Sequence, residues 1–268
     1  MNISGKRIVI TGGSSGIGFE LARQLGGKGA RLLLTGRRPN VLAAAVDRLK
    51  ADGFEAHGVS GDVTVPAARA HLLEHSIKLL GGVDMLVNNA GGVRAGRLED
   101  TTEAELRAMI EVDLLSPILL TRDFLPELRR SGDGLIVNIA SGIAQMGIPF
   151  YSGYAAAKGG LARFGEALRR ELKGEGVHVV TVFPGATDTP MMATTKADAS
   201  MGFALQPVAD VVASIVDGIE ADAFEVVRGG PARAALLDLN RTDPAAVDAR
   251  FLALKPGLES AVRDHSAL

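Results

Sequence analysis

With 268 residues, of which 47% are hydrophobic and 22% charged, the chain can bury the core of one domain or, at most, of two small ones. Its formal net charge of −2 and its lack of a basic stripe argue against nucleic acid or a membrane surface as a partner, and favour a small-molecule ligand. The sequence has no cysteine, which excludes disulfides, a thiol nucleophile and thiolate metal ligands. The first apolar run is too short for a signal peptide, and no run approaches the roughly 18 residues of a membrane helix, so we expect a cytoplasmic protein without membrane insertion.

Short, almost continuously apolar runs alternate along the chain with longer amphipathic segments. We expect strands at 7–11, 31–35, 54–60, 84–89, 134–141, 177–183 and 223–227. We expect helices at 16–28, 41–52, 67–80, 103–130 and 154–173. Strands of this kind are typical of a parallel sheet buried on both faces, so the pattern predicts a doubly wound α/β fold with about seven strands. No linker or repeat divides the chain, and we expect one domain over 1–268, with an irregular insert at 187–206 and a helical tail at 231–268.

A glycine-rich segment, TGGSSGIG at 11–18, follows the first expected strand and opens the first helix. Glycine at three of its positions lets the backbone approach a pyrophosphate, whose charge the helix amino terminus stabilises. A tight turn without a ligand is the alternative, but the position at the first crossover favours a dinucleotide. The candidate contacts in this segment are Gly12, Ser14, Ser15, Gly16, Ile17 and Gly18.

The end of the second expected strand carries TGRRPN, with Arg37 and Arg38. NAD sites usually place Asp or Glu here for the ribose 2′-hydroxyl, whereas a guanidinium is a good partner for a 2′-phosphate. The two arginines therefore favour NADP(H) over NAD(H), with Arg37 as the main contact. The alternative is that they merely begin a solvated helix.

Both tyrosines of the chain lie in FYSGYAAAKGG at 150–160. Lys158 follows Tyr154 by four residues and so shares its helix face, whereas Tyr151 has no cation at that spacing. A neighbouring ammonium favours the phenolate and lowers a pKa that is about 10 in water, so Tyr154 is the candidate acid–base group. Ser141, at the end of the fifth expected strand, can bind the same substrate oxygen. These residues predict transfer of a hydride and a proton at a carbonyl or an alcohol.

Over nearly its whole length the chain resembles the short-chain dehydrogenase/reductase family. The motifs that match, in the family's order and spacing, are TGGSSGIG at 11–18, GDV at 61–63, NNAG at 88–91, Ser141, YAAAK at 154–158 and PGATDT at 184–189. The resemblance implies a single Rossmann domain, a nicotinamide cofactor and a Ser-Tyr-Lys site. The opening MNISG and the extended tail look similar to the DltE-like oxidoreductase branch.

The same resemblance implies cofactor contacts beyond the glycine turn. It places the adenine beside Asp62 and Val63. It places the ribose beside Asn89, Ala90 and Gly91. It places the carboxamide side of the nicotinamide beside Pro184, Gly185, Thr187 and Thr189. Tyr154 and Lys158 would contact the nicotinamide ribose in addition to their part in proton transfer.

One residue departs from the family pattern. Where the family usually has a catalytic Asn, this chain reads EVDLLSP and has Asp113. In the family the main-chain carbonyl of that residue holds a water that links the active-site lysine to solvent, and Asp retains the carbonyl. We expect the relay to survive, while an ionised carboxylate near Lys158 would leave Tyr154 with a higher pKa and make catalysis slower or shift it to more alkaline pH.

Other features have ordinary explanations. HLLEH at 71–75 spells an inverted zinc-protease motif, but it falls on an expected crossover helix away from the strand ends, so we expect no metal site. The methionines and the phenylalanine of the insert at 187–206 suggest a substrate lid over a partly apolar pocket. Tyr151 either lines the pocket mouth or packs in the core. The family commonly forms homodimers or homotetramers, and a tail that covers the sheet edge used by tetramers would favour the dimer.

We therefore expect an NADP(H)-dependent carbonyl reductase or alcohol dehydrogenase. Tyr154 is the expected general acid and base, Lys158 its electrostatic partner, Ser141 the anchor for the substrate oxygen and Asp113 part of the proton relay. A 3-oxoacyl thioester reductase is the alternative within the same family. An alternative of another class is a regulatory protein that binds NADP(H) without turnover.

Overall fold

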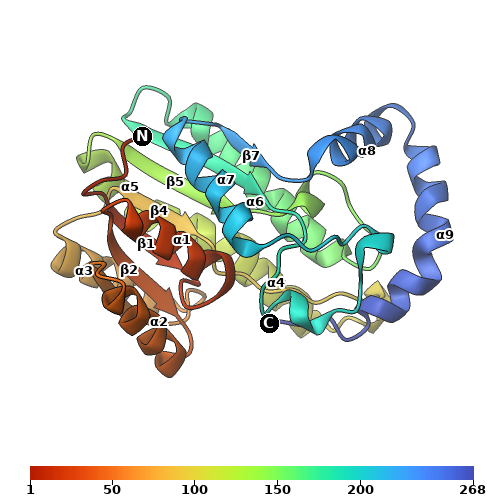
Figure 1. Ribbon diagram of the computed structural model, residues 1–268, viewed down its shortest axis with the longest axis horizontal. Helices are drawn as coiled ribbons and strands as arrows, with labels where there is room; N and C mark the ends of the chain where they lie inside the picture. Colours follow the sequence, from red (N-terminus) through yellow and green to blue (C-terminus); the bar gives the residue numbers. More distant parts are fainter.

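A parallel sheet of seven strands crosses the computed structural model, which describes residues 1–268 (Figure 1). The strands are β1 (Arg7–Thr11), β2 (Arg31–Gly36), β3 (Ala56–Ser60), β4 (Met85–Asn88), β5 (Gly134–Ile139), β6 (Val177–Phe183) and β7 (Glu225–Val227). Their order is β3-β2-β1-β4-β5-β6-β7, and every neighbouring pair is parallel. This order confirms the predicted doubly wound fold. The direction of winding reverses between β1 and β4, which opens a crevice beyond their carboxyl ends.

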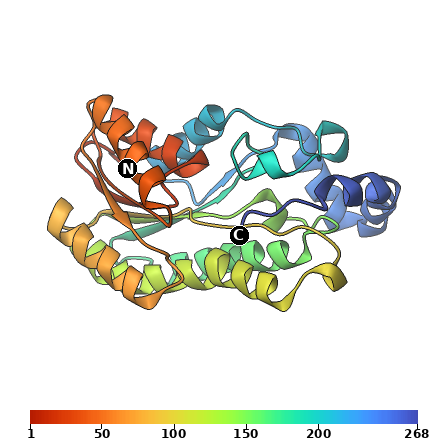
Figure 2. The ribbon, with the colours of Figure 1, turned by 90° about the horizontal axis from the view of Figure 1, so that it is seen from below.

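Helices cover both faces of the sheet. They are α1 (Gly16–Gly27), α2 (Pro39–Ala51), α3 (Pro66–Leu80), α4 (Glu103–Ile110), α5 (Ser116–Arg130), α6 (Ser152–Glu171), α7 (Val208–Glu220), α8 (Gly230–Thr242) and α9 (Pro244–Val262). One face carries α1, α2 and α7, and the other carries α3, α4, α5 and α6 (Figure 2). In β1, Ile8 and Ile10 pack into the first of these layers and Val9 into the second. Because successive strand residues point to opposite faces, a sheet covered on both sides requires the continuous apolar runs seen in the sequence.

Two helical segments differ from the prediction. The single helix expected at 103–130 is divided by a π-helical turn, Glu111–Leu115, between α4 and α5. Pro117, just after this turn, has no N–H to donate to the carbonyl four residues before it, which disfavours a regular α-helix there. The structure also adds α7, for which no helix was expected.

The tail forms an arm of two helices, α8 and α9, beyond the carboxyl ends of the strands (Figure 1). After α9 the chain returns to the loop that follows β4, where the N–H of Ala267 donates to the carbonyl of Val93 (2.8 Å) and the N–H of Ala95 to that of His265 (2.9 Å). The outer edge of β7 stays open, and Val227 on it is 47% exposed. The idea that the tail covers this edge is therefore wrong, because the arm closes over the end of the sheet instead. None of the helices combines the length and the apolar character needed to cross a membrane.

Candidate active site

A cavity of about 520 Å³ lies beyond the carboxyl ends of the central strands. Its walls come from the turn after β1, the loops after β4, β5 and β6, the first turns of α6, and the arm. Most of the site residues expected from the sequence line it, namely Gly12, Ser15, Gly16, Ile17, Asn89, Ala90, Gly91, Ser141, Tyr154, Lys158, Pro184, Gly185, Thr187 and Thr189. The fold thus brings motifs from five separate parts of the chain to one cavity.

The glycine turn after β1 is shaped to exclude side chains. Gly12 and Gly16 have φ angles of +63° and +55°, which favour glycine. A Cβ at Gly18 would lie 2.4 Å from both the Nδ2 of Asn89 and the carbonyl oxygen of Gly12. The same Nδ2 holds the turn by donating to the carbonyls of Thr11 (2.9 Å) and Gly12 (3.1 Å). The amino terminus of α1 therefore borders the cavity, where its free N–H groups can bind a pyrophosphate.

The end of β2 lies beside this turn but outside the cavity. Arg37 and Arg38 follow the strand, both are exposed, and neither side chain makes an ion pair or a hydrogen bond. A Cβ on Gly36 would lie 3.2 Å from the Oγ of Ser14, so the serine of the glycine turn is next to the strand end. Two guanidinium groups without a protein partner and a hydroxyl thus lie at the end of β2.

The loop after β3 carries Asp62 and Val63, which also lie outside the cavity. The Oδ1 of Asp62 accepts hydrogen bonds from the N–H (3.0 Å) and the hydroxyl (2.8 Å) of Thr64. Val63 is 7% exposed. Because β3 pairs in parallel with β2, this loop extends the same edge of the sheet, on the side where an adenine ring is expected.

Ser141, Tyr154 and Lys158 approach the cavity from two elements. Tyr154 and Lys158 lie one turn apart on α6 and are 9% and 4% exposed. The Nζ of Lys158 lies 5.9 Å from the centre of the Tyr154 ring and donates to the carbonyl of Ile139 (3.0 Å). Ser141 follows β5 and caps a short 3₁₀ turn, in which its Oγ accepts from the N–H of Ile143 (3.2 Å). A hydroxyl, a phenol and an ammonium group thus face one space.

Asp113 is fully buried in the π-helical turn and contacts the same lysine. Its Oδ1 lies 3.0 Å from the Nζ of Lys158 and accepts from the backbone N–H of Gly92 (3.2 Å). Four residues on, Pro117 leaves the main-chain carbonyl of Asp113 without an α-helical partner. The structure therefore places the Asp113 carboxyl beside the lysine, as the sequence led us to expect.

Burial and charge together set the ionisation of this group. Burial raises the pKa of Tyr154, Lys158 opposes this, Asp113 adds to it and Ser141 opposes it, and the net result is a pKa above the usual value. Burial alone would lower the pKa of Lys158, but Asp113 and Tyr154 raise it overall. Burial raises the pKa of Asp113, against the influence of Lys158 and of the Gly92 N–H. The lysine thus keeps its proton, while the net pKa of the Asp113 carboxyl beside it lies above the usual value because burial outweighs its partners.

The insert at 187–206 forms a strap over the cavity. Its far end is tied back, since the N–H of Gln206 donates to the carbonyl of Ala186 (2.9 Å) and Thr187 pairs with Gln206 in a β-bridge. Three apolar side chains of the strap line the cavity, namely Met191, Met192 and Phe203. The strap therefore gives the substrate side of the cavity an apolar, adaptable surface.

Tyr151 and residues of the arm complete the cavity wall. Tyr151 is 2% exposed, its hydroxyl lies 3.0 Å from the Nδ1 of His265, and its ring stacks on Phe203 at 5.8 Å. Tyr151 thus packs in the core and lines the cavity as well. Arg233 of α8 and Arg250 of α9 also reach the cavity. No motif marks the two arginines, because their place depends on how the arm folds back over the sheet.

Comparisons with known proteins agree with this architecture. The family model for short chain dehydrogenase matches residues 6–200. The ketoacyl reductase HetN of a Nostoc species is 32% identical over 226 residues, which cover 84% of this chain and 79% of that protein. A short chain dehydrogenase of Burkholderia cenocepacia, solved in complex with NADP, is 31% identical with a TM-score of 0.77 over 85% of this chain and 96% of that chain. A relative from Burkholderia phymatum, solved in complex with NAD, is 25% identical with a TM-score of 0.83 over 92% of this chain and 96% of that chain. The chain therefore belongs to the short-chain dehydrogenase family.

Proposed function

We propose that this oxidoreductase transfers hydride between NADP(H) and a carbonyl or secondary alcohol, with Tyr154 as its acid–base group. The observation that carries the proposal is that Ser141, Tyr154 and Lys158 face the same cavity that begins at the glycine turn. The family of the chain supports chemistry at a C=O or CH–OH group.

The residues present fit a nicotinamide dinucleotide. The positive φ angles of Gly12 and Gly16 shape the turn, the missing side chain at Gly18 lets it pack closely on Asn89, and Gly12 and Gly16 line the cavity where a pyrophosphate would bind. The residues that would hold the other parts are Asp62 and Val63 for the adenine, Asn89, Ala90 and Gly91 for the ribose, and Pro184, Gly185, Thr187 and Thr189 for the carboxamide. When bound, the cofactor would supply the hydride in reduction or accept it in oxidation.

The side chains of the site handle the proton and the substrate oxygen. In reduction, Tyr154 donates its phenolic proton to that oxygen, and its raised pKa keeps it protonated at neutral pH. The hydroxyl of Ser141 donates to the same oxygen and polarises the carbonyl. Lys158 stabilises the phenolate that remains, and Asp113 holds the lysine charged and in place. In oxidation the phenolate must form first, so the Asp113 carboxylate favours reduction at neutral pH.

We propose NADP(H) rather than NAD(H) as the preferred cofactor. Arg37 and Arg38 have no protein partner, and Ser14 lies beside the strand end that precedes them. A 2′-phosphate would give these guanidinium groups the bidentate acceptor they lack. One relative was solved with NADP and another with NAD, so membership of the family does not decide between the two cofactors. The positive charge of Arg37 and Arg38 is the feature that discriminates between them.

A 3-oxoacyl thioester reductase is the second candidate, and the ketoacyl reductase name of the Nostoc relative favours it. The remaining alternative, a protein that binds NADP(H) without turnover, requires a site that cannot transfer a proton. Ser141, Tyr154 and Lys158 are all in place, which speaks against it.

The test is the oxidation of NADPH, with NADH alongside, over a panel of ketones, aldehydes and 3-oxoacyl thioesters. Turnover of ketones that prefers NADPH supports the proposal, and turnover restricted to thioesters supports the second candidate. Tight NADPH binding with no turnover of any compound would contradict both and favour the binding protein.

A further inference from the structure

The charged side chains that line the cavity are all basic. They are Lys158, Arg228, Arg233 and Arg250, and no Asp or Glu is among the lining residues. The charge of Lys158 is compensated by Asp113 behind it. Arg228 is held by neutral partners, donating to the Oε1 of Gln206 (3.1 Å) and the Oγ of Ser214 (2.8 Å). The substrate side of the cavity therefore carries positive charge without a protein counter-ion.

Arg233 reaches the residue next to Ser141. Its guanidinium donates to the carbonyl of Gly142, the residue after Ser141, and a Cβ on Gly142 would lie 2.9 Å from its Cζ. Its Nε is buried and has no hydrogen-bond partner, and no carboxylate pairs with it. Because nothing offsets its burial, the pKa of Arg233 is lowered. A half-buried cation without a counter-ion costs stability unless an anion from outside the chain pairs with it.

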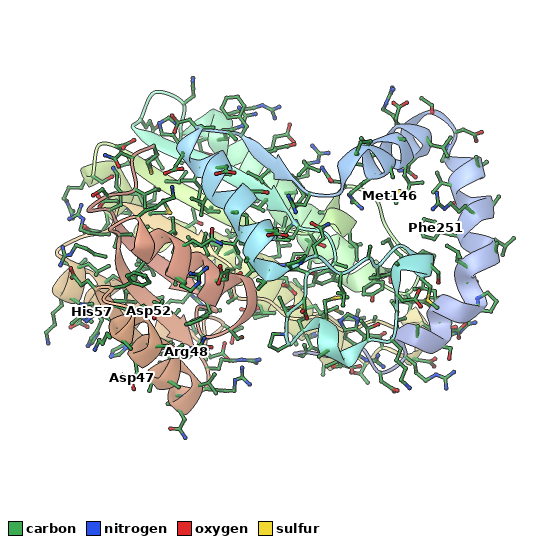
Figure 3. All side chains as sticks on the ribbon, viewed as in Figure 1. Asp47, Arg48, Asp52, His57, Met146 and Phe251 are labelled. Atoms are coloured by element: carbon green, nitrogen blue, oxygen red, sulfur yellow. The ribbon has the colours of Figure 1, made fainter.

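The arm positions this arginine. Arg233 lies in the first turns of α8, and α9 leads the chain back to the cavity through His265. Met146 and Phe251 lie between the loop before α6 and the inner side of α9 (Figure 3), and Met146 is 5% exposed. These apolar side chains pack beneath the arm, so the guanidinium is presented by a folded element and not by a free tail.

We infer that Arg233 binds a carboxylate of the substrate, and that the chain acts on short-spaced oxo acids or the matching hydroxy acids. This inference rests on the proposed function. Arg233 donates to the carbonyl of Gly142, whose Cα is about 3.8 Å from that of Ser141, so the guanidinium and the serine line neighbouring parts of one cavity. That spacing fits a carboxylate one or two carbons from the carbonyl, as in 2-oxo and 3-oxo acids. The remaining aliphatic chain would lie against the strap residues Met191, Met192 and Phe203.

The experiment compares 2-oxooctanoate and 3-oxooctanoate with their methyl esters, using NADPH and the full chain. For the wild type we expect kcat/KM to be higher for the acids than for the esters. Arg233→Met should reduce kcat/KM for the acids roughly 10- to 100-fold, mainly through KM, and change it less than about 3-fold for the esters. Arg233→Lys should restore part of the loss. Arg241→Met, at an exposed position on the same helix, is the matched control and should leave kcat/KM unchanged for the acids and for the esters.

Calorimetric titration of the same acids into protein saturated with NADP⁺ gives a readout independent of turnover. Weaker binding of the acids in Arg233→Met, with unchanged NADP⁺ binding, supports the inference. Equal loss for acids and esters, or a loss of NADP⁺ affinity instead, would overturn it by placing Arg233 in a structural or cofactor role. If ketones and esters are reduced but the acids show no preference, the inference fails while the proposed function stands. If no carbonyl compound is reduced, the proposed function fails, and the titration still decides whether Arg233 binds a carboxylate.

Discussion

Replacement of Asp113 by Asn should lower the pKa of Tyr154 by about one unit. The Nζ of Lys158 lies 3.0 Å from the Oδ1 of Asp113 and 5.9 Å from the centre of the Tyr154 ring, so that oxygen lies within about 9 Å of the ring. At this distance and an effective dielectric constant of about 20, repulsion between carboxylate and phenolate is about 1.8 kcal/mol, or about 1.3 pKa units. Lys158 holds its proton less firmly without its counter-ion, which reduces the expected shift to about one unit.

The assay is the pH dependence of kcat/KM for NADP⁺-dependent oxidation of a secondary alcohol. Oxidation requires the phenolate, so the rising limb follows the pKa of Tyr154 and should move about one unit to lower pH in Asp113→Asn. At a pH below the rising limb of both profiles, Asp113→Asn should then oxidise the alcohol about tenfold faster than the wild type. The exposed Glu103→Gln on α4 is the control and should leave the profile in place. If Asp113→Asn folds and binds the cofactor normally but its rising limb lies at the same pH as in the wild type, the idea that Asp113 opposes the phenolate is refuted.

Two further predictions concern the cofactor and the tail. Arg37→Ala should raise the KM for NADPH roughly 10- to 100-fold and leave the KM for NADH nearly unchanged. Arg38→Ala is the matched control and should have a smaller effect. An equal rise in KM for both cofactors would contradict the role of Arg37 at a 2′-phosphate. Burial lowers the pKa of His265 to about 4, whereas in an unfolded chain this pKa is about 6.5. Between these pH values the unfolded state binds a proton that the folded state does not. The free energy of unfolding should therefore fall as the pH drops from about 6.5 towards 4. The free energy of unfolding, measured with urea across this pH range, should depend less on pH in His265→Gln than in the wild type. An identical pH dependence in the two proteins would show that groups other than His265 cause the loss of stability.

The sheet was predictable because its signal is local. Runs such as RIVIT and VHVVTVF are mostly apolar and rich in β-branched residues, and the structure has strands at Arg7–Thr11 and Val177–Phe183 with those bounds. The predicted ends of other strands were less accurate, as at 54–60, where pairing with β2 begins only at Ala56. Hydrogen bonding to a neighbour, which the sequence of one strand does not contain, decides where each strand begins.

The site was predictable where its spacing is also local. Tyr154 and Lys158 share one helix face, and helical geometry alone brings them together. The contact between Lys158 and Asp113 depends on the packing of α6 against the π-helical turn, and only the resemblance to a family drew attention to it. Arg233 has no such signal. Its guanidinium reaches Gly142 from 91 residues away because the arm folds over the sheet, and tertiary packing of this kind leaves no periodic pattern.

The most direct test of the account is the NADPH-dependent reduction of a ketone by Tyr154→Phe, compared with Tyr151→Phe. The two changes remove the same hydroxyl from the two tyrosines of the chain, and Tyr151 hydrogen-bonds to His265 instead of facing Lys158. The account predicts that Tyr154→Phe binds NADPH normally but loses turnover by a factor of at least roughly 100, whereas Tyr151→Phe retains most of it. Comparable turnover in wild type and Tyr154→Phe would contradict the central claim that this phenol transfers the proton.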